Sequence, residues 1–298
     1  MENKSLKQII ANRLEKLDKI RQLGVNPYPY EFNVTCSTSD INKDSVDKKV
    51  SVAGRVMSLR KMGKAAFANI QDANGRVQLY IARDDVGEEN YNLFKLVDIG
   101  DFIGIDGIVF ITKTDALTVK AEKVTVLSKN LRPIPDVKEK DGEKYNSVSD
   151  KELRYRKRYI DMIINPETKD NYIKRFKIIN SIREFLNKNG YIEVETPVLQ
   201  PVYGGANAKP FKTFHNALDQ EFFLRIATEL YLKQLIVGGF EKVYEMSKDF
   251  RNEGIDRSHN PEFTMLEFYQ AYSDYNFMMD FVEKMFKKVA KDLGLKKI

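Results

Sequence analysis

Residues 243–272 read VYEMSKDFRNEGIDRSHNPEFTMLEFYQAY, two strand-like runs around a polar loop. Strict alternation in the second run predicts one face with Phe263, Met265, Glu267 and Tyr269, and another with Leu266, Phe268 and Tyr272. Because an unpaired buried charge is costly, Glu267 and Arg251 should face a polar ligand or each other. The pattern therefore predicts an antiparallel hairpin whose site suits a charged, flat substrate. A hairpin with a salt-bridged loop and no ligand fits the same residues.

Upstream, residues 50–127 are strand-like. An Asn74-Gly75 pair between alternating runs predicts a hairpin turn. A short helical stretch is predicted at 86–96. The five strand-like runs are SVAGRVMSLR, AAFANIQD, RVQLYIAR, DFIGIDGIVF and ALTVKAEKVTVLS. Five strands with a helix after the third predict a small Greek-key barrel of the OB type.

Two helices and a linker frame this barrel. Helical spacing of one set of residues predicts an amphipathic N-terminal helix, and these residues are Leu6, Ile9, Ile10, Arg13, Leu14, Leu17 and Ile20. The helix would either dock on the next domain or act as an RNA-binding arm. Residues 131–166 hold prolines and dense charge, which predicts a linker and then a short helix. Its RYRKRY run fits a solvated helix that packs its tyrosines, or a nucleic-acid patch. Residues 168–189 have helical apolar spacing ended by Gly190, and a strand should follow at 191–194.

Composition narrows the class of protein. The chain has 298 residues and a net charge of +6, which favours a polyanionic partner such as RNA, although a lysine-rich cytosolic protein would look similar. The lone Cys36 excludes an intrachain disulfide framework and a cysteine-based zinc site, while His215 and His259 are too few for a histidine cluster. The charged N-terminus and the absence of a long apolar run predict a cytoplasmic protein with no membrane span.

Several motifs in chain order resemble the lysine-specific members of the class II aminoacyl-tRNA synthetases. The loop text FRNEG (250–254), followed by SHNPEFTMLE (258–267), resembles motif 2 of that class, and GYIEVETPVL (190–199) resembles motif 1. GGANAKPF (204–211) and TELYLK (228–233) resemble the lysine-specific members and argue against the aspartate- and asparagine-specific ones. The resemblance runs from about residue 5 to the end of the chain.

This resemblance implies a site for activating L-lysine with ATP and Mg²⁺ and for transfer to tRNA(Lys). Arg251 would bridge the α-phosphate and the substrate carboxylate, because a guanidinium offers two parallel hydrogen bonds. The other implied ATP-binding residues are Glu253, His259, Asn260 and Phe263, with His259 alternatively bracing the loop. The resemblance implies that Gly205, Glu229 and Tyr269 bind lysine, with Glu229 alternatively a plain surface residue. Lysine carries two ammonium groups, so Glu267 is predicted to bind it as a second carboxylate.

The resemblance also assigns the barrel to the tRNA anticodon. The resemblance implies that Phe67, Gln78 and Glu122 bind the anticodon, and the charge of Arg60 would suit contact with a phosphate or a base. An aromatic ring can stack on an unpaired base, while amide and carboxylate groups can bind a base edge. From the pattern alone, Phe67 fits a core position equally well. The motif 1 region further implies a homodimer.

The predicted architecture is α+β: an N-terminal five-stranded OB-type β-barrel, then part of a class II synthetase antiparallel sheet with flanking helices. The predicted boundaries are an N-terminal helix at 1–30, the anticodon-binding barrel at 31–132, a linker at 133–166 and the catalytic portion at 167–298. Nothing after Tyr272 resembles motif 3 or supplies the magnesium ligands, so we expect the N-terminal portion of such an enzyme, with those ligands beyond residue 298. A non-catalytic tRNA-binding module and a dimerising regulatory paralogue remain alternatives.

Overall fold

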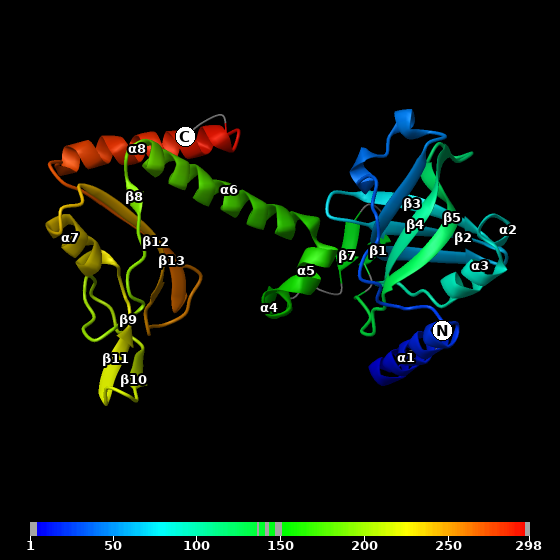
Figure 1. The fold of residues 1–298 in the computed structure, drawn as a ribbon, viewed down its shortest axis with the longest axis horizontal. Helices are drawn as coiled ribbons and strands as arrows, with labels where there is room; N and C mark the ends of the chain where they lie inside the picture. The colour runs from blue at the N-terminus through cyan, green and yellow to red at the C-terminus, as the bar shows by residue number, and fades with distance from the viewer. Residues whose placement is uncertain (1–4, 136, 141–142, 147–150, 296–298) are drawn as a thin grey trace. The chain divides into compact units, whose positions relative to one another are not determined.

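A computed structural model describes residues 5–135, 137–140, 143–146 and 151–295 of the chain. The chain divides into two compact units, Met1–Ile164 and Asn165–Ile298. We call them the barrel unit and the sheet unit and describe each by itself (Figure 1). No helix in the described ranges combines the length and the apolar character needed to cross a membrane.

The barrel unit contains the predicted closed barrel of five strands, joined in the order β1-β2-β3-β5-β4. Two short helices, α2 and α3, lie between β3 and β4, as the helical stretch predicted. The bounds are β1 Lys49–Met62, β2 Ala65–Gln71, β3 Arg76–Ala82, α2 Arg83–Val86, α3 Glu88–Lys95, β4 Phe102–Ile111 and β5 Leu117–Ser128. The OB-type topology is confirmed.

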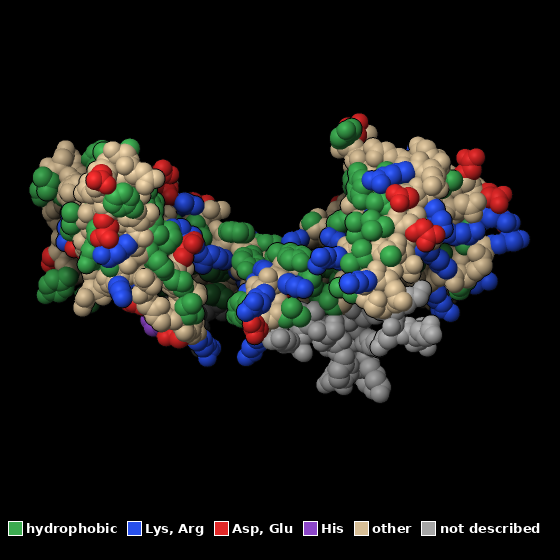
Figure 2. Space-filling model, turned by 90° about the horizontal axis from the view of Figure 1, so that it is seen from below, with side chains coloured by type: hydrophobic (Ala, Val, Ile, Leu, Met, Phe, Trp, Pro, Cys, Tyr) green, Lys and Arg blue, Asp and Glu red, His purple; other side chains and the backbone are tan. Residues whose placement is uncertain are grey.

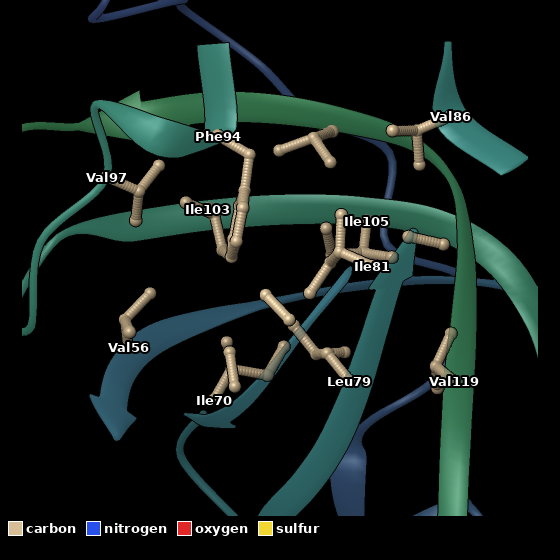
Figure 3. Close-up of a cluster of buried hydrophobic side chains, with 14 of the residues drawn as sticks. Val56, Ile70, Leu79, Ile81, Val86, Phe94, Val97, Ile103, Ile105 and Val119 are labelled. Atoms are coloured by element: carbon tan, nitrogen blue, oxygen red, sulfur yellow. The ribbon is translucent and has the colours of Figure 1, made fainter. Parts of the chain in front are cut away.

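The core of the barrel follows from alternation along its strands. In β2 every second residue is buried, and β3 shows the same pattern. Ile70, Leu79, Ile103 and Ile105 are fully buried and point toward one another inside the barrel, below Phe94 of α3 (Figure 3). Because successive side chains on a strand project to opposite faces, the intervening positions face outward and are available for binding.

The turn between β2 and β3 confirms the Asn-Gly prediction. Backbone N–H groups of Asn74 and Gly75 donate to the Asp72 carboxylate, each at 2.8 Å, and that of Thr38 donates at 2.7 Å. Burial alone would raise the pKa of Asp72, but these N–H groups together hold it far below its usual range. The carboxylate therefore fixes the hairpin and ties the short 3-10 helix Thr38–Asp40 to it.

The N-terminal helix α1 (Leu6–Gln22) begins with a capping box between Ser5 and Gln8. Its Leu17 and Ile20 are buried, and the Arg13 guanidinium donates to the carbonyls of Asn130 at 2.6 Å and Ile99 at 3.0 Å. The helix is thus docked on the barrel unit, one of the two alternatives. The apolar stripe is narrower than predicted, because Leu6 and Leu14 are exposed.

The predicted linker has more structure than its composition indicates. Strands β6 (Val137–Lys140) and β7 (Glu143–Asn146) pair antiparallel, and two short helices follow where one was predicted, α4 (Lys151–Arg156) and α5 (Arg158–Ile164). The expectation that this segment packs its tyrosines is wrong. Tyr155 and Tyr159 are 72% and 61% exposed.

The described residues of the sheet unit form two small sheets and three helices. Its main sheet has the order β13-β12-β8, with β12 and β13 antiparallel as predicted and β8 parallel to β12. The second sheet has the order β10-β11-β9. The bounds are α6 Pro166–Lys188, β8 Ile192–Glu193, β9 Leu199–Gln200, β10 Lys212–His215, β11 Gln220–Leu224, α7 Glu229–Val237, β12 Lys242–Phe250, β13 Glu262–Gln270 and α8 Tyr275–Asp292.

The two faces of β13 have different environments. Leu266 and Phe268 pack against a buried cluster from α6, β12 and α8 that includes Leu186, Tyr244 and Phe281. The opposite face therefore carries Phe263, Met265, Glu267 and Tyr269, as alternation predicted. Placing Tyr272 with the core face is wrong. The strand ends at Gln270, and Tyr272 lies beyond it in the left-handed region (φ 57°), 94% exposed.

Candidate functional site

The polar face of the main sheet is fixed by the pairing of β12 with β13. Glu245 pairs with Glu267, Ser247 with Met265 and Asp249 with Phe263. Directly paired residues project from the same face of an antiparallel sheet. The odd-numbered residues of both strands therefore share one face, and Arg251 follows directly after β12.

A half-buried carboxylate lies on this face. Glu267 Oε1 accepts from the backbone N–H of Thr228 at 3.4 Å, and Oε2 accepts from the Tyr269 hydroxyl at 3.0 Å. Burial raises the pKa of Glu267, and Asp249 and Glu229 raise it further by charge repulsion. Burial and the neighbouring Glu267 raise the pKa of Tyr269 as well. The surroundings thus disfavour an uncompensated anion, and a bound cation would relieve that cost.

Gly205 and Glu229 meet beside this carboxylate. Gly205 has φ 84°, and a Cβ there would lie 2.9 Å from the Glu229 Cβ, so a glycine allows the close approach. Glu229 opens α7 and pairs with Lys233 at 2.5 Å, and the Lys233 ammonium lies 6.0 Å from the centre of the Tyr269 ring. The hydrogen bond from Thr228 to Glu267 brings the start of α7, with Glu229, next to β13. All four predicted lysine-binding residues, Gly205, Glu229, Glu267 and Tyr269, therefore lie close together.

Arg251 lies at the end of the same face. Its Nε donates to the Ile226 carbonyl at 3.4 Å, and its guanidinium lies over the Phe263 ring at 5.1 Å. Within the described part of the chain, the N–H groups of Nη1 and Nη2 donate no hydrogen bond to another residue. The two-nitrogen edge that suits a carboxylate or phosphate is therefore left for a ligand.

The loop between β12 and β13 carries the other predicted ATP-binding residues, Glu253, His259 and Asn260, all exposed. His259 Nδ1 lies 2.8 Å from Asp256 Oδ2, and its backbone N–H donates to Asp256 Oδ1. This is the loop-bracing role considered for His259. Glu253 accepts from the backbone N–H of Lys209 at 3.3 Å and so ties the loop to the 204–211 segment.

A buried ionic cluster beside these residues escaped the sequence analysis. The Arg225 guanidinium contacts Glu245 at 2.7 Å and Asp249 at 3.2 Å, and all three side chains are at least nine-tenths buried. Ser247 donates to Asp249 Oδ1 at 2.9 Å, and burial raises the pKa of Asp249. Within the described ranges, Asp249 Oδ2 and Thr228 Oγ1 are buried without a hydrogen-bond partner. Polar residues at alternate positions of β12, namely Glu245, Ser247 and Asp249, are the signal in the sequence that points to this cluster.

On the barrel unit, three of the four predicted anticodon-binding residues line one cavity of about 490 Å³, namely Arg60, Phe67 and Gln78. Its other lining residues are Ser58, Leu59, Asn69, Thr112 and Thr114. Phe67 is half-buried on the outward side of β2 and packs against Tyr80, with ring centres 5.1 Å apart. Its position excludes the core alternative, because the core residues of β2 are its neighbours Ala66 and Ala68.

The structure does not bring Glu122 to this cavity. Between Asp106 and Gly107 the register of β4 with β5 shifts, so that Glu122 is the extra residue of a β-bulge. It pairs with Lys49 at 3.2 Å.

On the face in Figure 2, Lys and Arg side chains gather over the barrel unit at the right of the picture. That charge suits a phosphate backbone.

The described residues include no group of three or more His, Cys, Asp or Glu side chains placed to hold a metal ion. The predicted Mg²⁺ therefore has no protein-built site in this part of the chain. Mg²⁺ commonly keeps substrate phosphates among its ligands, so this observation concerns only a dedicated protein site.

Comparison with known proteins gives two family matches. Residues 150–298 match the model described as tRNA synthetases class II (D, K and N). Residues 50–127 match the OB-fold nucleic acid binding domain. The two matches cover the sheet unit and the barrel respectively.

Curated relatives with the name lysine–tRNA ligase match nearly the whole chain. The protein from Porphyromonas gingivalis is 51% identical over 94% of this chain and 51% of its own length. The protein from Carboxydothermus hydrogenoformans is 50% identical over 97% of this chain and 59% of its own. The protein from Azobacteroides pseudotrichonymphae is 54% identical over 93% of this chain and 58% of its own length. The chain spans between half and three-fifths of the length of these relatives.

Proposed function

Since this chain belongs to the class II tRNA synthetases, in the group described as D, K and N, we propose that it acts as a lysine–tRNA ligase. The proposed reaction is activation of L-lysine by ATP to lysyl-adenylate, followed by transfer to tRNA(Lys). The similarity to three lysine–tRNA ligases at 50–54% identity supports this specificity.

The observation that carries the proposal is the half-buried Glu267 on the polar sheet face, held by Thr228 and Tyr269. A substrate with ammonium groups at both ends needs carboxylates for both, and Glu229 and Glu267 lie in one region. Gly205 allows the chain to pass close to Glu229, so the backbone can approach a bound amino acid.

Arg251 is the proposed catalytic residue. Activation requires the lysine carboxylate to attack the α-phosphorus of ATP, so two anions must be held together. The free edge of the guanidinium can contact both and stabilise the charge that develops during attack. Phe263 lies beneath Arg251 and offers an aromatic face toward adenine, while Glu253, His259 and Asn260 on the adjoining loop would bind the rest of ATP.

Mg²⁺ is proposed as the ion that accompanies the ATP phosphates and neutralises part of their charge. We assign it no protein ligand among the described residues.

The barrel is the proposed anticodon-binding domain for tRNA(Lys). Phe67 offers a ring for stacking on an unpaired base, Gln78 offers an amide to a base edge, and Arg60 offers charge to a phosphate. The resemblance implies the same role for Glu122. Because it lies outside the cavity and pairs with Lys49, it could act only on a neighbouring nucleotide.

A homodimer through the motif 1 region is part of the proposal. The exposed apolar residues there include Ile192, Val198 and Leu199, which are 50%, 39% and 49% exposed. Large exposed apolar side chains grouped on one surface are typical of an interface. A cytoplasmic location is proposed from the single cysteine, because disulfide frameworks are typical of oxidising compartments.

Lysine-dependent exchange of pyrophosphate into ATP by the purified chain tests the proposal. Glu267→Gln should abolish the exchange, because the side chain keeps its shape and loses its charge. Lys233→Ala, which removes an exposed partner of Glu229, should retain most of it. Absence of exchange in the unmodified chain would overturn lysine activation by this chain. RNA binding in that case would favour the non-catalytic tRNA-binding module.

A further inference from the structure

Three polar side chains form a row across the outer surface of the barrel. The register pairs Ser58 of β1 with Asn69 of β2, and Asn69 with Gln78 of β3. All three line the cavity that contains Phe67. Phe67 lies two residues before Asn69 on the same strand, so its ring and the two amides open onto the same space.

The hydrogen bonds of the two amides leave complementary groups toward the cavity. Asn69 Nδ2 donates to the Ser58 hydroxyl at 2.8 Å, which leaves its carbonyl oxygen as an acceptor. The buried Thr118 hydroxyl donates to Gln78 Oε1 at 2.8 Å, which leaves the Gln78 N–H groups as donors. Directly paired residues on adjacent strands have Cβ atoms about 5 Å apart. One acceptor and one donor therefore lie side by side.

We propose that Asn69 is a further base-reading residue, which binds, together with Gln78, the edge of the base that stacks on Phe67. This inference rests on the proposed RNA-binding function of the barrel and adds a residue to it. Ser58 is a positioning residue, since it fixes which group Asn69 presents.

The base edge that best fits the Asn69 acceptor and the Gln78 donor is that of uracil. Uracil carries an N3–H donor with a carbonyl acceptor on each side. The N3–H can therefore face Asn69 while either of the two carbonyls faces Gln78. Asn69 would accept from N3–H, and Gln78 would donate to the adjacent carbonyl. Cytosine has no N3–H and fits the pair in only one orientation. The cavity should therefore favour an unpaired uridine.

The test uses the full chain and an RNA hairpin with unpaired uridines in its loop, with affinity measured by fluorescence anisotropy. A second hairpin carries N3-methyluridine at the same loop positions and lacks the donor. We expect N3-methylation to weaken binding by the unmodified chain about five- to tenfold, the loss expected for one hydrogen bond. Asn69→Ala should weaken binding of the plain hairpin by a similar factor and should not discriminate against the methylated one.

Two variants keep the result interpretable. Gln71→Ala changes the next outward residue of β2, which does not line the cavity, and should behave as the unmodified chain does. Ser58→Ala should weaken binding about two- to threefold and retain the methylation penalty. Circular dichroism of each variant checks that the barrel is folded.

The outcomes separate this inference from the proposed function. An equal methylation penalty in Asn69→Ala and the unmodified chain would overturn the role of Asn69. The RNA-binding function would still stand if Phe67→Ala weakened binding. If Phe67→Ala bound the hairpin as tightly as the unmodified chain, or if the latter did not bind it, the proposed interface would fall and the role of Asn69 with it.

Discussion

The two units both bury charged side chains, but they place them differently with respect to their candidate sites. In the barrel unit, Lys129 is buried against Asp98 and Asp101, and none of the three lines the cavity around Phe67. In the sheet unit, Arg225 with its two carboxylates occupies the face that also carries Glu267. In the barrel unit, the buried charged residues that stabilise the fold are thus separate from the residues of the candidate site. In the sheet unit, the two sets of residues adjoin each other on one face.

Alternation explains the separation in the barrel. Leu79 points into the core and Gln78, its neighbour, lines the cavity. A closed barrel has only one buried side, so each strand can carry a core residue and a binding residue at successive positions. The main sheet of the second unit packs against α6 and α8 on one face, and its other face, beside which α7 lies, is polar and partly buried. A substitution there changes folding and ligand binding together.

The largest expected effect comes from Arg225→Met. It would leave Glu245 and Asp249 buried without their cation, which should lower the free energy of unfolding by about 3–5 kcal/mol. Hydrogen exchange should show faster exchange in β12 and β13 and unchanged protection in β1 to β5. Arg183→Met, which removes an exposed partner of Glu193, is the control and should cost about 0–1 kcal/mol. A loss below about 1 kcal/mol for Arg225→Met would contradict the importance of the cluster.

The second prediction compares neighbours on β3. Leu79→Ala removes a fully buried side chain and should cost the barrel about 3 kcal/mol in the free energy of unfolding. Gln78→Ala should lower that free energy by less than about 1 kcal/mol, because the Thr118 hydroxyl keeps the Ala116 carbonyl at 3.2 Å as an acceptor, and it should weaken RNA binding instead. Urea unfolding gives the stability of both variants and fluorescence anisotropy gives their RNA affinity, so together they check whether stability and binding depend on different residues. Comparable destabilisation by both would show that the cavity residues also support the fold.

The sequence predicts the barrel well because its signals are local. Alternation and the Asn74-Gly75 turn lie within single hairpins, and the structure confirms both. The strands β6 and β7 were missed because prolines and dense charge at 131–146 indicate a linker. Tyr272 was assigned to the wrong face because alternation gives no signal for where a strand ends.

The candidate sites were harder to predict where they depend on contacts between distant segments. The motif residues Glu267, Tyr269 and Arg251 could be proposed from resemblance and alternation. Arg225 pairs with Glu245 and Asp249 only after the chain has folded back, and a charged residue in a strand is ordinarily taken as exposed. The position of Glu122 could not be predicted either. It lies at a single-residue β-bulge, and alternation along the sequence does not show where a bulge occurs.

The third prediction isolates binding from stability in the barrel. Phe67→Ala should lower the affinity for an unpaired uridine loop by about 1–3 kcal/mol, since base stacking on an aromatic ring contributes that much. Thermal unfolding of the barrel should change far less than in Leu79→Ala, because Phe67 is only half-buried. Unchanged affinity together with a lower melting temperature would reverse the assignment and make Phe67 a structural residue.

The smallest expected effect tests the linkage between charge and folding in the sheet unit. Burial raises the pKa of Asp249, so the folded chain binds this proton more readily than the unfolded chain. The stability that comes from the protonated form is complete below the ordinary carboxyl pKa and is lost as the pH rises through the raised pKa. Asp249→Asn carries no charge at any pH and escapes this loss. Relative to the unmodified chain, the variant should therefore gain stability as the pH rises.

Asp274→Asn provides a control of opposite sign for that measurement. The backbone N–H of Phe277 at the start of α8 lowers the pKa of Asp274, so its ionised form stabilises the fold. This variant should lose stability relative to the unmodified chain as the pH rises. Urea unfolding at a series of pH values gives both differences. If Asp249→Asn followed the same direction as Asp274→Asn, the ion pair with Arg225 would outweigh burial, and Asp249 would be an ordinary stabilising anion like those of the barrel.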